Sequence, residues 1–580
     1  MIQTSDRNRI ITFWILLAAC CLTILPFLGL ADFNTKGEPR EAVVALSILE
    51  QNDWILPTNN GGEIPYKPPF FHWCVAAASS LFNGGNVNEY TSRLPSALAL
   101  IVTVMATFNF FSRRRDLLTG LLAAAVTFTT LEMQRAGTNT RVDMVLTMFT
   151  VLAIYSLYDW NCRRRRRFPW VAILYMSCAT LTKGPVGIIV PCLAIGVFML
   201  TRRVNFFKAL GWMALMAAAS LIIPLVWYYA AYLERGDAFL DLVLEENFGR
   251  MTNTMSYDSC VHPWPYNIGV LLSGLLPWTV ACIFALFTIR IRRSNGESTP
   301  LPQRIKHFFS QKDSLAPFAL ITAATIFIFY CIPQSKRSVY LLPMYPFVAY
   351  WLARMLIAAT RNSRKAMLCF YHLIAGIAML LFVAFISFKI GLVPESLFSH
   401  GRHAAENLQI YHNLCDATGW RVWLCASVPP LAALAWWIWG CRMRSDLLPV
   451  GCAGVVMAVF LSVWGAYQPC VMNAKSVKPV AQLIEKELPA DAPIYEYIHA
   501  AETALGDPLH YFEVNFYLGD RIRNFRKESP REGWLMISDE DFATHGSEFE
   551  AEGYRFDATL SSPRPVMRQA TSIHHFTRTE

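Results

Sequence analysis

Long apolar blocks alternate with short polar loops over roughly the first 470 residues of the chain. A helix that crosses a bilayer needs about 20 predominantly apolar residues, and most of these blocks approach that length. The first block is longer than the core of a signal peptide, and no small-residue cleavage site is obvious after it, so it is interpreted as a retained helix. The thirteen predicted membrane helices cover residues 10–30, 92–111, 117–131, 142–158, 169–181, 185–200, 206–233, 266–289, 315–332, 339–357, 367–390, 422–439 and 447–464.

The loops between these blocks differ in charge. Lys and Arg gather in alternate loops, for example at 113–115, 163–167 and 202–208. Because positive loops stay on the cytoplasmic side of a bacterial inner membrane, this alternation predicts a cytoplasmic N-terminus. An odd number of helices then places the C-terminal segment in the periplasm.

The last part of the chain has a different pattern. From about residue 471 the composition turns polar, with strand-like runs at 492–498 and 534–537 and an amphipathic helical stretch at 477–488. The predicted fold class is therefore an all-α polytopic membrane protein with a small C-terminal α/β soluble domain. We expect a membrane domain at 1–470, with long outer loops at 31–90, 234–265 and 391–421, and a periplasmic domain at 471–580.

The composition is typical of a membrane protein, and together with the motifs it limits the partners and cofactors that we expect. Hydrophobic residues make up 54% and charged residues 16%, against about 25% charged in soluble domains. The net charge of +9 lies in short loops, which disfavours nucleic acid as a partner. No Walker or Rossmann loop is found, and the 15 cysteines show no metal-ligand spacing. We expect no cofactor and no required metal, although a role for a divalent metal stays open.

The first outer loop is rich in acids. Asp32, Glu38 and Glu41 follow the first membrane helix, with Arg40 among them. A carboxylate held at this depth can orient or deprotonate an acceptor. The alternative is a solvated loop with ordinary charges.

Later in the same loop, Tyr66 and Lys67 precede two prolines. Proline restricts the backbone, so the Lys67 ammonium would be presented rigidly near the lipid headgroups, where it can bind a phosphate. The alternative is a lysine that extends to the membrane surface without a specific ligand.

Two further sites lie at the outer ends of helices. Arg141 and Asp143 stand at the mouth of the fourth membrane helix, where an acid is costly unless it is paired or functional. A structural Arg141–Asp143 pair is one interpretation. Lys183 lies in the tight turn before Gly184 and Pro185, where it can bind an anion or cap helix carbonyls.

Cations, carboxylates and tyrosines also occur in two more outer loops. Such cations can neutralise a lipid phosphate or simply anchor the loops at the headgroups. Together, five separated loops that deliver charges to one face favour a site. The candidates in these two loops are Glu246, Asn247, Arg250, His262, Lys336, Arg337 and Tyr340.

An ordered series of motifs resembles the lipid-linked-sugar glycosyltransferases of the aminoarabinose (lipid A) transferase and protein O-mannosyltransferase group, which have the GT-C fold. The resemblance is closest to the aminoarabinose transferase branch and covers most of the membrane part. The motifs are Gly37-Glu38-Pro39-Arg40-Glu41, Tyr66-Lys67-Pro68-Pro69-Phe70, Arg141-Val142-Asp143, Leu181-Thr182-Lys183-Gly184-Pro185, Glu246-Asn247-Phe248-Gly249-Arg250 and Ser335-Lys336-Arg337.

The resemblance implies inverting transfer of a sugar from a polyprenyl phosphate to an acceptor at the periplasmic face. Lys67 and Arg250 would bind the donor phosphate with Tyr340 beside it, and a first-loop acid would orient the acceptor. We add Lys183, Lys336 and Arg337 to the phosphate-binding candidates. The substrate-binding candidates are Arg40, Tyr66, Arg141, Glu246, Asn247 and His262.

One position departs from the family pattern. The family usually has an acid pair in the first loop, but here Gly37 occupies the first position and Glu38 the second. Asp32 or Glu41 can substitute for the missing acid, and Asp143 matches the family well. The four candidate catalytic acids are therefore Glu38, Asp143, Glu41 and Asp32.

Three functions follow from these patterns. The leading one is glycosylation of lipid A or a related envelope glycolipid. A protein O-glycosyltransferase of the same fold is the first alternative, and a lipid or glycolipid transporter is the second. A transporter places polar residues near the bilayer midplane, whereas these helix interiors are nearly free of charge.

Overall fold

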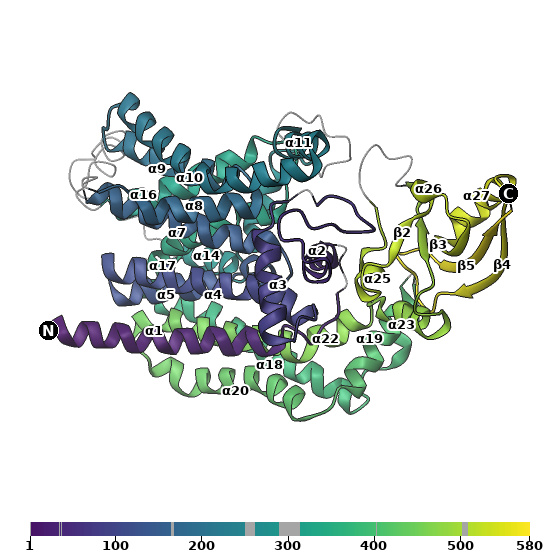
Figure 1. Ribbon diagram of the computed structural model, residues 1–580. Helices are drawn as coiled ribbons and strands as arrows, with labels where there is room; N and C mark the ends of the chain where they lie inside the picture. Colours follow the sequence, from purple (N-terminus) through teal and green to yellow (C-terminus); the bar gives the residue numbers. More distant parts are fainter. Residues whose placement is uncertain are drawn as a thin grey trace. The chain divides into compact units, whose positions relative to one another are not determined.

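The apolar blocks of the sequence form long helices that lie side by side (Figure 1). In the computed structural model the described residues are 2–33, 35, 37–65, 67–163, 167–249, 261–288, 314–401, 403–500 and 509–579. The chain divides into two units. The first comprises 1–28, 93–228 and 261–470, and the second comprises 29–92, 229–260 and 471–580.

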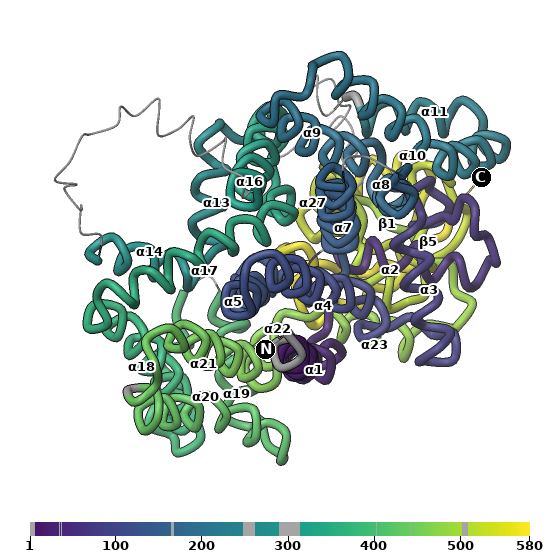
Figure 2. The backbone as a smooth tube through the Cα atoms, turned by 90° about the vertical axis from the view of Figure 1, so that its left-hand side faces the viewer, coloured from purple at the N-terminus to yellow at the C-terminus, as the bar shows by residue number. Residues whose placement is uncertain are grey.

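The first unit is helical. Figure 2 views α1 and α7 along their axes, so the axes of these two helices are roughly parallel. Among the described elements three helices cross the unit boundary, because α4 begins in the second unit and both α10 and α22 (Gln468–Asn473) end there. The helices are α1 (Ile2–Ile24), α4 (Glu89–Arg114), α5 (Leu117–Phe128), α6 (Leu131–Gly137), α7 (Val142–Cys162), α8 (Trp170–Lys183), α9 (Val186–Thr201), α10 (Phe206–Arg235), α13 (Tyr266–Gly274), α14 (Trp278–Leu286), α16 (Leu315–Cys331), α17 (Tyr345–Asn362), α18 (Arg364–Lys389), α19 (Ala404–Asp416), α20 (Trp420–Trp439) and α21 (Leu448–Ser462).

The predicted number of thirteen membrane helices is not confirmed. Within the described part of the chain, eight helices are long and apolar enough to cross a membrane, or up to ten if two bent pairs count as spans. Every predicted block contains a helix, but α8, α9 and α16 have only 14, 16 and 17 residues. The bent pairs are α5 with α6, at 64°, and α13 with α14, at 94°. Pro277 stands at the second bend, where it cannot continue the hydrogen-bond ladder of α13.

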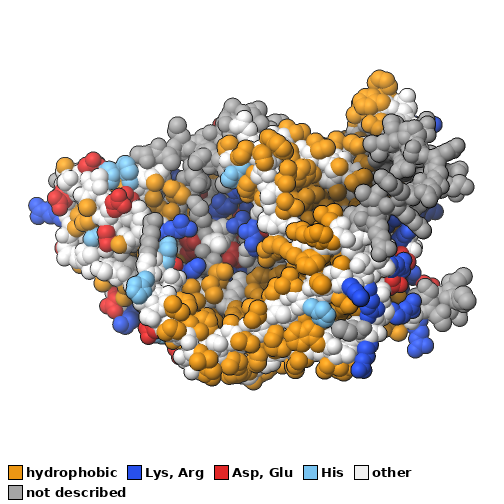
Figure 3. Space-filling view, turned by 180° about the vertical axis from the view of Figure 1, so that it is seen from behind, with side chains coloured by type: hydrophobic (Ala, Val, Ile, Leu, Met, Phe, Trp, Pro, Cys, Tyr) orange, Lys and Arg blue, Asp and Glu red, His pale blue; other side chains and the backbone are white. Residues whose placement is uncertain are grey.

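The side chains exposed on the first unit indicate which medium surrounds it. Trp14 and Leu22 on α1, Val226 on α10 and Leu380 on α18 each expose 61–68% of their surface. Figure 3 shows a wide hydrophobic surface on one face of the molecule, with Lys and Arg gathered at one edge. Apolar surface of this extent is unfavourable in water and favourable in lipid. The protein is therefore a multi-pass membrane protein.

The second unit contains the C-terminal α/β fold that the sequence predicted. Its five-stranded sheet has the order β2-β1-β3-β5-β4. Strand β1 pairs in parallel with β2 and β3, and β5 pairs antiparallel with β3 and β4. The strands are β1 (Ile494–Tyr497), β2 (Ile522–Asn524), β3 (Glu532–Ser538), β4 (Tyr554–Ser561) and β5 (Thr571–Arg578).

Alternation along the strands builds two cores, one on each face of the sheet. Ile494 and Met536 pack in one core with α23 (Lys478–Glu487) and α25 (Phe512–Tyr517). Their neighbours, Tyr495 and Ile537, pack in the other core. That second core is completed by α26 (Phe525–Glu528) and α27 (Asp539–Ala551).

The first outer loop belongs to the same unit as the C-terminal segment. It contains α2 (Gly37–Gln51) and α3 (Phe70–Phe82), and residues 229–260 add α11 (Asp237–Leu244) and the short π-helix Glu245–Gly249. Helix α3 was not predicted from the sequence. A separate domain at 471–580 stays a prediction, because contacts group this segment with the loop.

Candidate functional site

A buried carboxylate surrounded by cations lies in the first outer loop. Glu41 is on α2, 4% exposed, and forms ion pairs with Lys67 and with Arg40, whose Nη2 lies 3.5 Å away. Its second oxygen contacts His72 Nε2 at 3.0 Å. Three predicted site residues, Arg40, Glu41 and Lys67, are thus in contact. We call these three residues and His72 the Glu41 cluster.

The cluster keeps Glu41 ionised. Burial opposes the charge on this carboxylate, but Lys67, the hydrogen bond from His72 and the charge of Arg40 hold the pKa of Glu41 well below its usual range. A carboxylate so strongly stabilised as an anion is a poor proton acceptor. Glu41 is therefore suited to holding Lys67 in place rather than to deprotonating an acceptor.

The local sequence explains how Lys67 and His72 reach Glu41. Pro68 and Pro69 restrict the backbone after Lys67, and Pro69 is the N-cap of α3. This start places His72 in the first turn of α3, 1% exposed. Its Nδ1 is buried with no hydrogen-bond partner in the described structure, so the ring is best satisfied as the tautomer that donates from Nε2.

His72 was missed as a site residue. His72 has no neighbouring residues at metal-ligand spacing that would mark it as functional. A usable signal was present, because His72 follows the Lys67-Pro68-Pro69 sequence by three residues. A helix that begins after the prolines returns a side chain at that spacing to the region of Lys67.

The other two first-loop acids have different surroundings. Glu38 lies in the first turn of α2, 2% exposed, where a helix N-terminus stabilises a carboxylate. Asp32 forms an ion pair with Lys478 at 3.4 Å. Its backbone N–H donates to Asn473 Oδ1 at 2.9 Å. Asp32 therefore connects the loop to the first residue of α23 and to the segment before it, and a catalytic role for Asp32 stays a prediction.

A second charged group lies in the first unit. Asp143 in the first turn of α7 forms an ion pair with Lys183 at the end of α8. The Lys183 ammonium is 4.4 Å from the centre of the Tyr340 ring, within the range of a cation–π interaction. The structure therefore pairs Asp143 with Lys183 and not with Arg141. The Arg141 carbonyl accepts a hydrogen bond from Ser96 Oγ at 3.1 Å.

Lys336 was predicted to bind phosphate but has structural contacts. It is 4% exposed, and its ammonium donates to the carbonyls of His262 at 2.9 Å and Pro333 at 2.6 Å. The His262 ring stacks on Tyr266 at 4.0 Å. Lys336 thus connects the His262 segment to the segment around Pro333, and its binding of a phosphate stays a prediction.

Several predicted residues stay untested. Tyr66 and Arg250 lie outside the described residues. Glu246 and Asn247 lie in the π-helix, where Asn247 Nδ2 donates to the Val243 carbonyl at 2.7 Å. Within the described ranges, no three or more His, Cys, Asp or Glu side chains are placed to hold a metal ion.

Comparison with known proteins agrees with the resemblance found in the sequence. Residues 66–228 match the family model described as dolichyl-phosphate-mannose-protein mannosyltransferase. The chain is 27% identical over 355 residues to the undecaprenyl phosphate-alpha-4-amino-4-deoxy-L-arabinose arabinosyl transferase of Shewanella sediminis, an alignment that spans 60% of each protein. It is 23% identical over 450 residues, 75% of each protein, to the equally named protein of Pectobacterium carotovorum.

A solved structure has the same fold. The crystal structure of ArnT from Cupriavidus metallidurans bound to undecaprenyl phosphate aligns with a TM-score of 0.68, covers 97% of both chains and is 16% identical. The chain therefore has the GT-C fold, and its ordered motifs resemble those of the membrane glycosyltransferases that share this fold. Within that class the chain is ArnT-like.

Proposed function

We propose that this protein transfers a sugar from a polyprenyl phosphate to lipid A or a related envelope glycolipid. The transfer takes place at the periplasmic face of the inner membrane, with the N-terminus in the cytoplasm and the C-terminal segment in the periplasm. The Glu41 cluster carries the proposal, because it holds the Lys67 ammonium in a proline-restricted loop. The family match begins one residue before Lys67.

The reaction needs a stabilised leaving group. An oxygen of the acceptor attacks C1 of the sugar from the face opposite the phosphate, and the bond between C1 and the phosphate oxygen breaks. The bonding electron pair stays on that oxygen, so polyprenyl phosphate leaves with an additional negative charge and the configuration at C1 inverts. Lys67 stabilises this charge as it grows, and Arg250 is predicted to help by its motif.

Glu38 is the acid that we assign to the acceptor. Glu41 is committed to cations and Asp32 to Lys478, whereas Glu38 has the position next to Gly37 where the family carries its acid pair. A carboxylate there orients an acceptor hydroxyl and takes its proton as the new bond forms. Asp143 and Lys183 stay predicted site residues within the first unit.

A comparison of cells with and without the gene identifies the acceptor of the sugar. Mass spectrometry of the envelope lipids should show that a sugar substituent of lipid A disappears in the deletion strain. The matched family model is named for transfer to protein, so secreted and envelope proteins are measured in the same strains. Loss of sugar from proteins alone would favour a protein O-glycosyltransferase, and unchanged lipids and proteins would overturn the proposal.

A further inference from the structure

Within the second unit, helix α25 of the C-terminal segment packs against helix α2 of the first outer loop. Phe516 packs with Phe33, Ala42 and Val43, and the Phe33 and Phe516 rings are 4.9 Å apart. The guanidinium carbon of Arg40 lies 6.0 Å from the centre of the Phe512 ring. The helix that carries Glu38 and Glu41 is therefore packed on α25.

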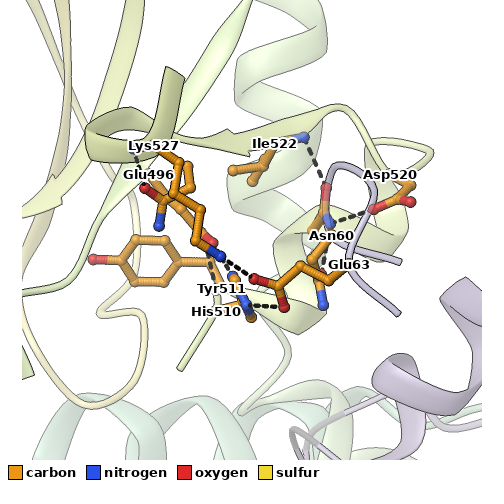
Figure 4. A network of polar contacts seen from close by, with 10 residues as sticks. Asn60, Glu63, Glu496, His510, Tyr511, Asp520, Ile522 and Lys527 are labelled. Carbon is orange, nitrogen blue, oxygen red and sulfur yellow. Dashed lines mark hydrogen bonds and ion pairs between the residues drawn. The ribbon is translucent and has the colours of Figure 1, made fainter. Parts of the chain in front are cut away.

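The same segment holds a turn at 59–63, which precedes Lys67 (Figure 4). Asn59 and Glu63 are bridged, and the turn between them contains Gly61 and Gly62, both with positive φ. Asn515 Nδ2 donates to Asn60 Oδ1 at 2.9 Å and to Asp520 at 2.7 Å.

Glu63 anchors the end of this turn. Lys527 Nζ lies 2.7 Å from one oxygen of Glu63, and His510 Nε2 lies 3.0 Å from the other. The second ring nitrogen of His510 contacts Glu496, which also accepts from the backbone N–H of Tyr511 at 2.9 Å. In Figure 4 the His510 ring lies between the two carboxylates.

This arrangement requires a charged His510. Both ring nitrogens face carboxylates, and only imidazolium has a donor at each nitrogen. Burial opposes the charge, but the hydrogen bonds and charges of Glu496 and Glu63 raise the pKa of His510 to about 10. Hydrogen bonds of this charge-assisted kind are about twice as strong as neutral ones, so the turn is held firmly.

We infer that His510, with Lys527 and Asn515, is a positioning element for donor binding: it fixes the 59–63 turn and thereby the place of the Lys67 ammonium. This inference rests on the proposed function, in which Lys67 binds the donor phosphate. In its described residues, 52–65 and 67–69, the peptide between α2 and α3 has no helix of its own, and its order depends on such anchors. A catalytic or binding group displaced by about 1 Å can lose up to a hundredfold in activity.

Two measurements on the full-length protein in detergent test the inference. In His510→Gln, hydrogen–deuterium exchange of the 57–65 peptide should accelerate, and the Kd for undecaprenyl phosphate should rise about tenfold. His575→Gln is the matched control, because His575 pairs with Asp557 inside the C-terminal sheet and should change neither value. Glu63→Gln, at a position where the side chain is 29% exposed, repeats the test should His510→Gln fold poorly.

The outcomes separate this inference from the proposed function. Unchanged exchange in His510→Gln and Glu63→Gln would overturn the inference, as would faster exchange with an unchanged Kd. Wild-type protein that does not bind undecaprenyl phosphate would count against the proposed function. The exchange measurement then still decides whether His510 holds the turn.

Discussion

Lys67 and Glu41 form an ion pair between two segments of one outer loop, with Glu41 almost fully buried. A buried pair is costly to break, because the remaining charge is left without compensation. The pair therefore holds Lys67 in one place before a substrate arrives. An arriving phosphate adds a second anion to a lysine that is already positioned.

Replacing Lys67 tests the donor-phosphate assignment directly. Lys67→Ala removes the charge that stabilises the leaving phosphate, and we expect transfer from an undecaprenyl-phosphate sugar to fall by about 10²–10³ in reconstituted vesicles. Lys486→Ala, at an 80% exposed position in the same unit, should keep full activity. Full activity of Lys67→Ala would remove the assignment.

The two acids of α2 should respond differently to neutralisation. We expect Glu38→Gln to lose about 10²–10⁴ in kcat, the contribution of a general base. Glu41→Gln should lose about tenfold, because it loosens Lys67 without removing a proton acceptor. Paired measurements of kcat for the two variants are sufficient. The reverse order, with Glu41→Gln the more damaged, would return the role of base to Glu41.

The architecture was predictable from sequence wherever one short-range pattern determines it. Apolar blocks predict helices because lipid requires every backbone group to be satisfied inside the segment, and each block does contain one. The number of spans is not confirmed, because α8, α9 and α16 are short and two pairs are bent. The pattern of apolar residues does not predict the angle between α13 and α14.

Contacts between segments far apart in the chain could not be predicted from the sequence. The motifs contain Glu41 and Lys67 but do not show that the two side chains form a pair. His72 reaches Glu41 only because it is buried at the start of α3. The contact of His510 with Glu63 joins residues 447 positions apart. Such a contact depends on the tertiary fold, which the composition of the two segments does not specify.

The Asp143–Lys183 pair can be tested by comparing single and double substitutions. Asp143→Asn leaves the Lys183 ammonium without its anion, and we expect about 3–5 kcal/mol of destabilisation. The double variant Asp143→Leu with Lys183→Met should regain stability, since it removes both charges. Thermal unfolding in detergent measures the stability of both variants, and a sugar-transfer assay measures their activity. A stable double variant with full activity would show that the pair is purely structural.

The His510–Glu63 interaction should give the second unit a defined pH dependence. The pKa of Glu63, lowered from 4.5 to about 2 against the cost of burial by His510 and Lys527, adds stability that is complete above pH 4.5 and lost as the pH falls toward 2. The raised pKa of His510 adds stability that is complete below its unfolded value of 6.5 and lost as the pH rises toward 10. The contribution should therefore be largest between pH 4.5 and 6.5.

Asp520 adds a pH dependence of stability with the same sign as that of His510, and one substitution can isolate it. Burial raises its pKa from 3.8 to about 6, although Asn515 and the backbone N–H groups of Asn60 and Gly61 favour the charged form. A raised carboxyl pKa means that stability is complete below 3.8 and falls as the pH rises through 6. Asp520→Asn keeps an oxygen acceptor without the charge, and Asn tolerates the positive φ of 56° at this position. Exchange protection of the 57–65 peptide should therefore increase in Asp520→Asn at pH 7.5 and stay near wild type at pH 4. Equal protection in the two proteins at pH 7.5 would show that the buried Asp520 carboxylate carries no such cost.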